Sequence, residues 1–252
     1  LVWLLLTWNP VTLPIAWQGI SGQEGSGTVA VLPSTTVVAE IVAALAVGTS
    51  TAKVPSTQVV LGQTSTVPDP SCPGLPCQAI GSVTGFQVSN GQTRSPFIVP
   101  HDGTIKSWSL TLAQPTNKQR SFFNGFFGTP PEARLAILRR VPGTNPPRYT
   151  LRSQGSIKVL TPYFGQTVKF GSSLKVEKGD IVGITVPTWA PAFAQELDST
   201  EVWRASREPG TCTNSTDIRQ GEPLEKVNKR ATFGCKYSTA RLLYTATLVE
   251  GP

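Results

Sequence analysis

The sequence predicts an all-β fold, and within that class an antiparallel β-sandwich of jelly-roll-like topology. Valine, threonine and aromatic residues fill short runs between turns, and the 252 residues include 23 glycines and 22 prolines. Several runs alternate apolar and polar residues, as half-buried strands do. We expect no helical segment between these runs, and many short strands without helices are typical of sandwiches.

The predicted sandwich domain covers residues 83–252. In residues 104–112, alternation places Trp108, Leu110 and Leu112 on one buried face and Ile105 on the other face. Gly179 lies between two apolar runs, where it can adopt the positive φ of a tight turn. The expected strands cover residues 83–88, 96–100, 104–113, 133–140, 148–153, 156–160, 166–170, 174–176, 181–187, 231–237 and 240–249.

Two segments precede this domain. Residues 1–52 are largely apolar, and the first basic residue of the chain is Lys53. We interpret them as an atypical signal or anchor segment, or as the product of a mis-assigned start; a helix packed on the domain is the alternative. Residues 53–82 are rich in proline, threonine and serine and are predicted to be a linker.

The four cysteines predict two disulfide bonds. Cys72 and Cys77 flank a short Pro-Gly segment, and Cys212 and Cys235 lie close together near the end of the chain. We expect the pairs Cys72–Cys77 and Cys212–Cys235 and, with them, a secreted or cell-surface protein. Because His101 is the single histidine, we expect no metal centre, no catalytic triad and no cofactor.

Charge is unevenly distributed along the chain. The formal net charge is +7, and 12 of the 22 basic residues lie between Arg94 and Lys175, a segment whose acidic residues are Asp102 and Glu132. Such a basic segment can attract an anionic polymer, although spaced charges also suit an ordinary solvated face. The sequence does not predict specific binding of nucleic acid.

The most informative candidates for a binding site are aromatic. Proline residues bracket Trp189 in "PTWAPAF" (residues 187–193), and the motif "WRASR" places Trp203 beside Arg204 and Arg207. Exposed tryptophan beside arginine suits a ligand such as a sugar ring. The alternative is that Trp189 is a lid on the core. The tentative ligand-binding set is Trp189, Trp203, Arg204 and Arg207.

The motif "SFFNGFFG" predicts a β-hairpin, because Asn-Gly is a strong signal for a two-residue turn. Facing aromatic pairs would stabilise it, and the outward rings could contact another subunit. This homo-oligomer contact would use Phe122, Phe123, Phe126 and Phe127.

Clustered carboxylates give two further hypotheses. Glu196, Asp198 and Glu201 are a weak candidate for a calcium site, since hard cations bind oxygen ligands from loops. A glycan-degrading enzyme would need two carboxylates across a cleft, and these three together with Glu132 are the candidates.

Four stretches carry a resemblance. They are "PFIVPHDGTIKSWSLTL", "LKVEKGDIVGITVPTWAPAF", "WRASR" and "ARLLYTATL", and they span about two thirds of the chain. In them the chain resembles a class of uncharacterised secreted bacterial β-sandwich proteins of unknown function. The resemblance implies export and a sandwich fold, and it supplies no activity.

The sequence therefore favours an exported, non-enzymatic protein that binds a carbohydrate or a cell-wall polymer. The first alternative is a self-associating surface module of the trimeric jelly-roll type. The second alternative is the glycan-degrading enzyme.

Overall fold

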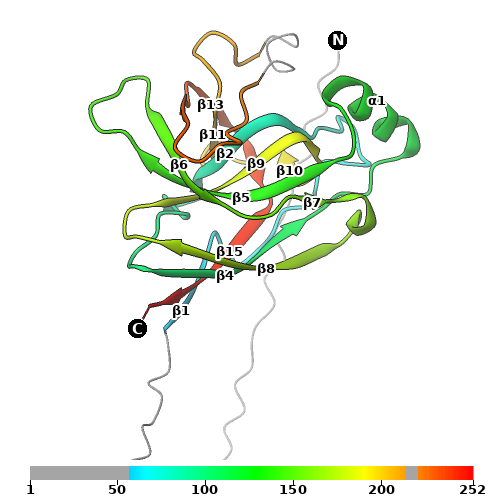
Figure 1. The fold of residues 1–252 in the computed structure, drawn as a ribbon. Helices are drawn as coiled ribbons and strands as arrows, with labels where there is room; N and C mark the ends of the chain where they lie inside the picture. Colours follow the sequence, from blue (N-terminus) through cyan, green and yellow to red (C-terminus); the bar gives the residue numbers. More distant parts are fainter. Residues whose placement is uncertain (1–56, 214–220, 252) are drawn as a thin grey trace, which may run out of the picture. The chain divides into compact units, whose positions relative to one another are not determined.

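The computed structural model describes residues 57–213 and 221–251, and it confirms the all-β class (Figure 1). The predictions for residues 1–52 lie outside the described residues. In chain order, the elements are β1 (Gln58–Leu61), β2 (Ile80–Asn90), β3 (Thr93–Arg94), β4 (Gly103–Thr111), α1 (Asn117–Phe127), β5 (Glu132–Arg140), β6 (Arg148–Gln154), β7 (Lys158–Val159), a 3-10 turn (Thr161–Tyr163), β8 (Thr167–Val176), β9 (Ile181–Ala190), β10 (Phe193–Gln195), β11 (Val202–Ala205), β12 (Arg230–Thr232), β13 (Cys235–Ser238), β14 (Ala240–Leu242) and β15 (Tyr244–Glu250).

The principal strands pair in the nested order of a jelly roll. β1 pairs with β15, β2 with β9, β4 with β8 and β5 with β6. In chain order, each of these pairs therefore encloses the next. All four pairs are antiparallel. The result is two facing sheets, β1-β15-β4-β8 and β6-β5-β9-β2, which is jelly-roll architecture.

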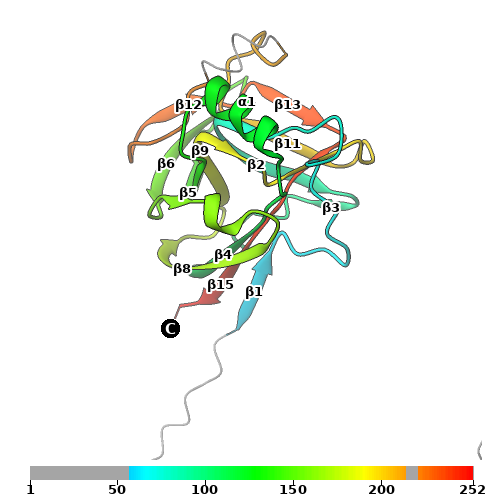
Figure 2. The same ribbon diagram turned by 90° about the vertical axis from the view of Figure 1, so that its right-hand side faces the viewer.

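The segment between β9 and β15 enlarges the second sheet. Its strands β11 and β13 continue the sheet beyond β2, and β12 continues it beyond β6, giving the order β12-β6-β5-β9-β2-β11-β13. Strands β10 and β14 form a separate two-stranded ribbon. Figures 1 and 2 show the enlarged sheet curling away from the smaller sheet. The curl gives the sheet a concave outer face in addition to the face it turns to the sandwich core.

The core between the sheets consists of the inward residues of both. Trp108 and Leu110 of β4 are buried, as the alternation predicts. Ile105 is also fully buried, contrary to prediction, because the register between β4 and β8 shifts after it and reverses the alternation. Gly179 has a φ of 85° in the turn before β9, as expected.

The predicted linker is wrong for most of its length. Strand β1 lies inside it and pairs with β15 along Gln58–Leu61, and β2 begins at Ile80. The alternation in so short a strand is too brief to distinguish it from the surrounding polar sequence. The segment 57–79 is therefore part of the folded domain.

The predicted Asn-Gly hairpin is also wrong, because residues 117–127 form the helix α1. Thr116 caps this helix: its hydroxyl accepts a hydrogen bond from the Gln119 backbone N–H, and the Gln119 side chain accepts one from the Thr116 backbone N–H. This reciprocal capping box specifies a helix start. Of the four phenylalanines, Phe123 is buried and Phe122 is 61% exposed.

Both predicted disulfide bonds are confirmed. Cys72–Cys77 closes a small loop before β2, and Cys212–Cys235 joins the segment after β11 to β13. On the chain-entropy model the second bond stabilises the fold by about 3 kcal/mol. Two disulfides are typical of an oxidising compartment. Among the described residues, no helix is long and apolar enough to span a membrane.

The buried phenol of Tyr244 makes the stability of the fold vary with pH in the alkaline range. Its ring stacks on Phe97 at a centroid distance of 4.0 Å, and its hydroxyl donates to the Val182 carbonyl at 2.9 Å. Complete burial raises the pKa of Tyr244 well above its ordinary value of 10.0. The folded protein therefore keeps the phenol protonated where the unfolded chain releases the proton.

We expect the free energy of unfolding to fall as pH rises above 10, because only the unfolded state then ionises this phenol. One such group contributes a slope of about 1.4 kcal/mol per pH unit. Denaturant titrations of the wild type and of Tyr244→Phe between pH 8 and 11 measure it. The variant loses a hydrogen bond at every pH, so the comparison is between slopes. Equal slopes would contradict the assignment.

Candidate functional site

A pocket of about 410 Å³ opens at the end of the sandwich where α1 lies. The Cys72–Cys77 loop, the end of α1, strand β10 and the strands β11 and β13 surround it. The lining mixes aromatic rings with polar side chains. A site of this size and composition belongs to the class that binds small ligands.

Trp203 forms the inner wall of this pocket. Its ring stacks on that of Tyr237, its register partner in β13, at a centroid distance of 4.6 Å, and Phe193 of β10 approaches edge-on at 6.0 Å. The Trp203 side chain is buried, and its indole N–H has no acceptor among the described residues. Trp203 therefore lines the predicted site as part of a packed aromatic group, with Tyr237 half-exposed beside it.

Arg207 holds this wall in position. The guanidinium is buried, and it donates to the Gly81 carbonyl of β2 at 2.8 Å and to the Tyr237 hydroxyl at 3.3 Å. That hydroxyl in turn donates to the Cys212 carbonyl at 3.0 Å. Arg207 thus lines the pocket and also links β2 to the disulfide-bonded segment.

The opposite side of the pocket is formed by the end of α1. A Cβ atom on Gly81 would lie 2.4 Å from the ring of Phe127, so only glycine allows that ring to pack here. Phe127 is half-exposed, and its ring meets Phe126 edge-on at 4.7 Å. The helix missed by the sequence analysis therefore supplies an aromatic surface to the site.

Polar groups complete the rim. Gln195 and Glu196 follow one another at the end of β10, and Ser238 and Thr239, at the end of β13, line the pocket beside them. The Gln195 amide also donates to the Pro76 carbonyl in the disulfide loop. Amide, carboxylate and hydroxyl groups together offer both donors and acceptors to a ligand.

Arg204 does not belong to this pocket. It follows Trp203 directly in β11, and successive side chains of a strand point to opposite faces. Its guanidinium donates to the Phe233 carbonyl on the concave outer face of the enlarged sheet. Of the residues in the predicted binding set, Trp203 and Arg207 therefore line one pocket, and Arg204 lies outside it.

Trp189 is a core residue and not a ligand platform. It is fully buried, its indole N–H donates to the Asn124 side chain at 2.9 Å, and its ring lies 5.0 Å from Phe123 and 5.7 Å from Phe164. The lid alternative is thus correct and the binding assignment is wrong. The partner that the sequence analysis did not predict is α1, whose Phe123 and Asn124 contact Trp189.

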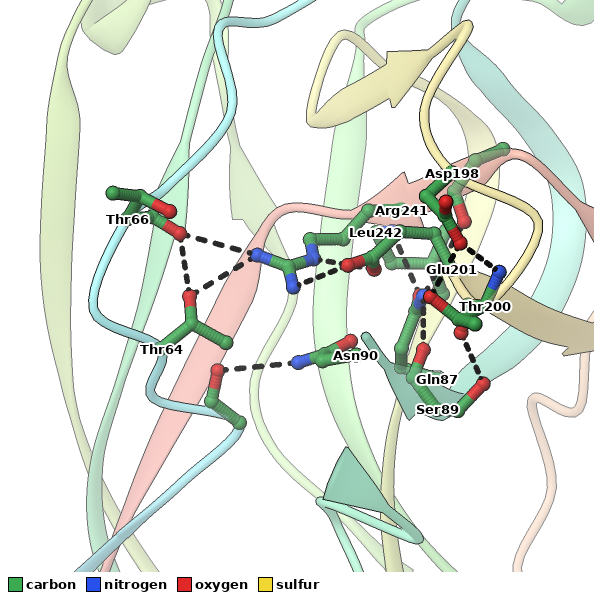
Figure 3. A network of polar contacts seen from close by, with 12 residues as sticks. Thr64, Thr66, Gln87, Ser89, Asn90, Asp198, Thr200, Glu201, Arg241 and Leu242 are labelled. Atoms are coloured by element: carbon green, nitrogen blue, oxygen red, sulfur yellow. Dashed lines mark hydrogen bonds and ion pairs between the residues drawn. The ribbon is translucent and has the colours of Figure 1, made fainter. Parts of the chain in front are cut away.

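The carboxylate cluster is divided between structural roles. Glu201 is buried and forms a two-pronged ion pair with Arg241, with both N–O distances at 2.8 Å (Figure 3). The Asp198 carboxylate accepts hydrogen bonds from the backbone and hydroxyl of Thr200. These bonds lower the pKa of Asp198. Neither residue lines the aromatic pocket.

The arrangement does not form the predicted calcium site or a catalytic pair. Within the described ranges, no three acidic, cysteine or histidine side chains are grouped as metal ligands. Glu196 lines the aromatic pocket, while Asp198 and Glu201 line a different one. Glu132 lies opposite Val159 where β5 meets β7.

Arg241 uses the ion pair to fasten the segment before β2. Figure 3 shows its guanidinium between Glu201 and the segment that joins β1 to β2. There it donates to the Thr64 hydroxyl at 3.1 Å and to the Thr66 carbonyl at 3.4 Å. A buried charge needs this kind of compensation because its desolvation is costly. The pair thus explains why the supposed linker is ordered.

The fold and site define a disulfide-bonded jelly-roll protein with an aromatic pocket at one end of the sandwich. Comparisons of the chain with protein-family models, with curated proteins and with solved structures gave no significant match.

We predict that Trp189→Ala lowers the free energy of unfolding by about 3–5 kcal/mol, since it removes a large buried ring. Phe122→Ala is the matched aromatic control. That ring is largely exposed, so its removal should change stability by no more than about 0.5 kcal/mol. Denaturant unfolding of both variants measures the difference. If Trp189→Ala lowers the free energy of unfolding as little as Phe122→Ala does, Trp189 is not in the core.

We also predict that Glu201→Gln lowers the free energy of unfolding by about 3–5 kcal/mol, because Arg241 would remain buried without its counter-charge. The double variant Glu201→Leu, Arg241→Met removes both charges and should be more stable than Glu201→Gln. Denaturant unfolding of the two variants and the wild type measures this. A double variant that is less stable than Glu201→Gln would argue against a coupled pair.

Proposed function

We propose that this is an exported, non-enzymatic protein that binds a saccharide in the aromatic pocket. One observation carries the proposal: the half-exposed rings of Phe127 and Tyr237 lie in the same pocket as the amide of Gln195 and the carboxylate of Glu196. Aromatic faces beside hydrogen-bonding groups match the two kinds of surface that a sugar presents.

The chemistry of a sugar fits this lining in two ways. Its ring has apolar C–H faces, which pack favourably on the electron-rich face of an aromatic ring. Its hydroxyls both donate and accept hydrogen bonds, so a carboxylate such as Glu196 and an amide such as Gln195 can each be used. The pocket of about 410 Å³ lies within the size range of small-ligand sites.

Three further observations support the proposal. Of the four carboxylates considered for catalysis, Glu196 alone lines the aromatic pocket, which favours binding over glycan cleavage there. The two disulfides favour an exported protein. The net charge of +7 favours a partner such as an anionic cell-wall polymer, whose long-range attraction would bring saccharide units to the pocket.

The test is saccharide binding by paired variants on the same helix. Isothermal titration of the full chain with soluble glucan, xylan, mannan and cell-wall fragments identifies a ligand. Phe127→Leu should weaken binding of that ligand about three- to tenfold, because the leucine cannot stack on a sugar face. Phe122→Leu makes the same change outside the pocket and should leave binding intact.

A second pair tests the polar rim. Glu196→Gln should weaken binding, while Glu132→Gln, which changes the same chemical group elsewhere, should not. If both Phe127→Leu and Glu196→Gln bind the ligand as strongly as the wild type does, the pocket assignment is refuted. The native mass of the wild type and of Phe122→Leu tests the alternative of a trimeric jelly-roll module. That alternative alone requires the wild type to be a trimer and the native mass to fall in Phe122→Leu.

A further inference from the structure

A second pocket, of about 350 Å³, opens at the concave outer face of the enlarged sheet. Its walls include Phe86 of β2, Tyr149 of β6 and Ile98 from the segment before β4. Two arginines, Arg140 and Arg204, also line it. The mouth of a curled or closed sheet is a common position for ligand sites.

Strand register brings these side chains to one face. Arg204 of β11 is the register partner of Phe86 of β2, and Arg140 of β5 is the register partner of Tyr149 of β6. The rings of Phe86 and Tyr149 meet edge-on at 5.1 Å, and Phe233 lies within 5.7 Å of both. The rings of Phe86 and Tyr149 form an apolar floor to the pocket, and Phe233, which does not line it, packs against both.

The pocket carries positive charge without a neutralising partner in its lining. None of its lining residues in the described chain is acidic. The nearest carboxylates in sequence, Glu177 and Asp180, flank its Gly179 and are both bound by Arg139, at 2.8 and 2.6 Å. Arg204 donates one bond to the Phe233 carbonyl, while Arg140 is exposed.

The charges of both arginines act on the pKa of Tyr149. Burial raises the pKa of Tyr149, and the positive charges of Arg204 and Arg140 oppose that shift. Both guanidiniums are therefore within electrostatic reach of the ring that floors the pocket. An anion bound in this pocket would be attracted by two positive charges, more strongly by the half-buried Arg204 than by the exposed Arg140.

We propose that this pocket binds an organic anion, namely a carboxylate carried on a flat apolar ring. Planar guanidiniums form paired, charge-assisted hydrogen bonds with a carboxylate, and the floor of Phe86 and Tyr149 accommodates the ring. The site is distinct from the saccharide pocket, because Arg204 and Trp203 lie on opposite faces of β11. It does not depend on the proposed function.

The test uses 2-naphthoate as the probe and 2-naphthylmethanol as its neutral analogue. Fluorescence titration of the full chain should show naphthoate binding at least about tenfold more tightly, because only the carboxylate makes charge-assisted bonds to arginine. Inorganic sulfate should compete weakly. Equal affinity for the two probes would overturn the proposal, as would sulfate binding as tightly as naphthoate, which would indicate an oxyanion site without ring recognition.

Variants locate the site. Arg204→Gln should weaken naphthoate binding at least about tenfold, and Arg140→Gln less, since Arg140 is more exposed. Arg120→Gln, on α1, is the matched control and should bind normally. Phe127→Leu should also bind naphthoate normally, which separates this result from any failure of saccharide binding. Unchanged affinity in Arg204→Gln would overturn the assignment.

A spectroscopic readout guards against a purely structural effect. Naphthoate bound beside Tyr149 places a negative charge near its phenol, so the pKa of Tyr149 should rise further on binding. Absorbance titration of the wild type and of Tyr149→Phe, each with and without naphthoate, isolates this phenol. The titration of Tyr149→Phe should not respond to naphthoate. If naphthoate also leaves the alkaline titration of the wild type unchanged, the proposed position is overturned.

Discussion

The pairing of β11 with β2 is the constraint on which both pockets depend. It adds a strand beyond the last strand of the jelly-roll sheet, with Arg204 opposite Phe86. Because side chains alternate along a strand, Trp203 then turns to the aromatic pocket and Arg204 to the concave outer face. A shift of this register by one residue would exchange the two side chains and alter both sites.

Contacts at the end of β11 and in the segment that follows it maintain this register. The Cys212–Cys235 bond ties the segment after β11 to β13, the strand on its other side. Arg207 connects Gly81 of β2 with the hydroxyl of Tyr237, so the strands on both sides of β11 are joined. Polar groups on the outer face act in the same way: the Ser206 hydroxyl accepts from the Thr84 backbone and donates to the Glu222 carbonyl. The jelly roll supplies the scaffold, and this cross-linked addition supplies both pockets.

Sequence patterns predicted the fold class and both disulfides, because alternation and cysteine spacing are local signals. They located the long strands but failed where a tertiary contact decides. Asn124-Gly125 signals a hairpin, yet the capping box at Thr116 and the packing of Phe123 on Trp189 produce a helix. Two of the four proposed binding residues, Trp203 and Arg207, do line one pocket. The burial of Trp189 and the orientation of Arg204 depend on α1 and on strand register, which no neighbouring residues encode. The Thr-x-x-Gln capping signal was present in the sequence and could have identified the helix.

The most direct test of this account is a nuclear Overhauser measurement on the full chain that maps the neighbours of β11. The account predicts contacts from the Trp203 ring to Tyr237 and Phe193, and contacts from the Arg204 side chain to Phe86 and Tyr149. It predicts none between the Trp203 and Tyr149 rings. Contacts from Trp203 to Phe86 and Tyr149 would contradict it, since they would place β11 in the opposite orientation and merge the two sites.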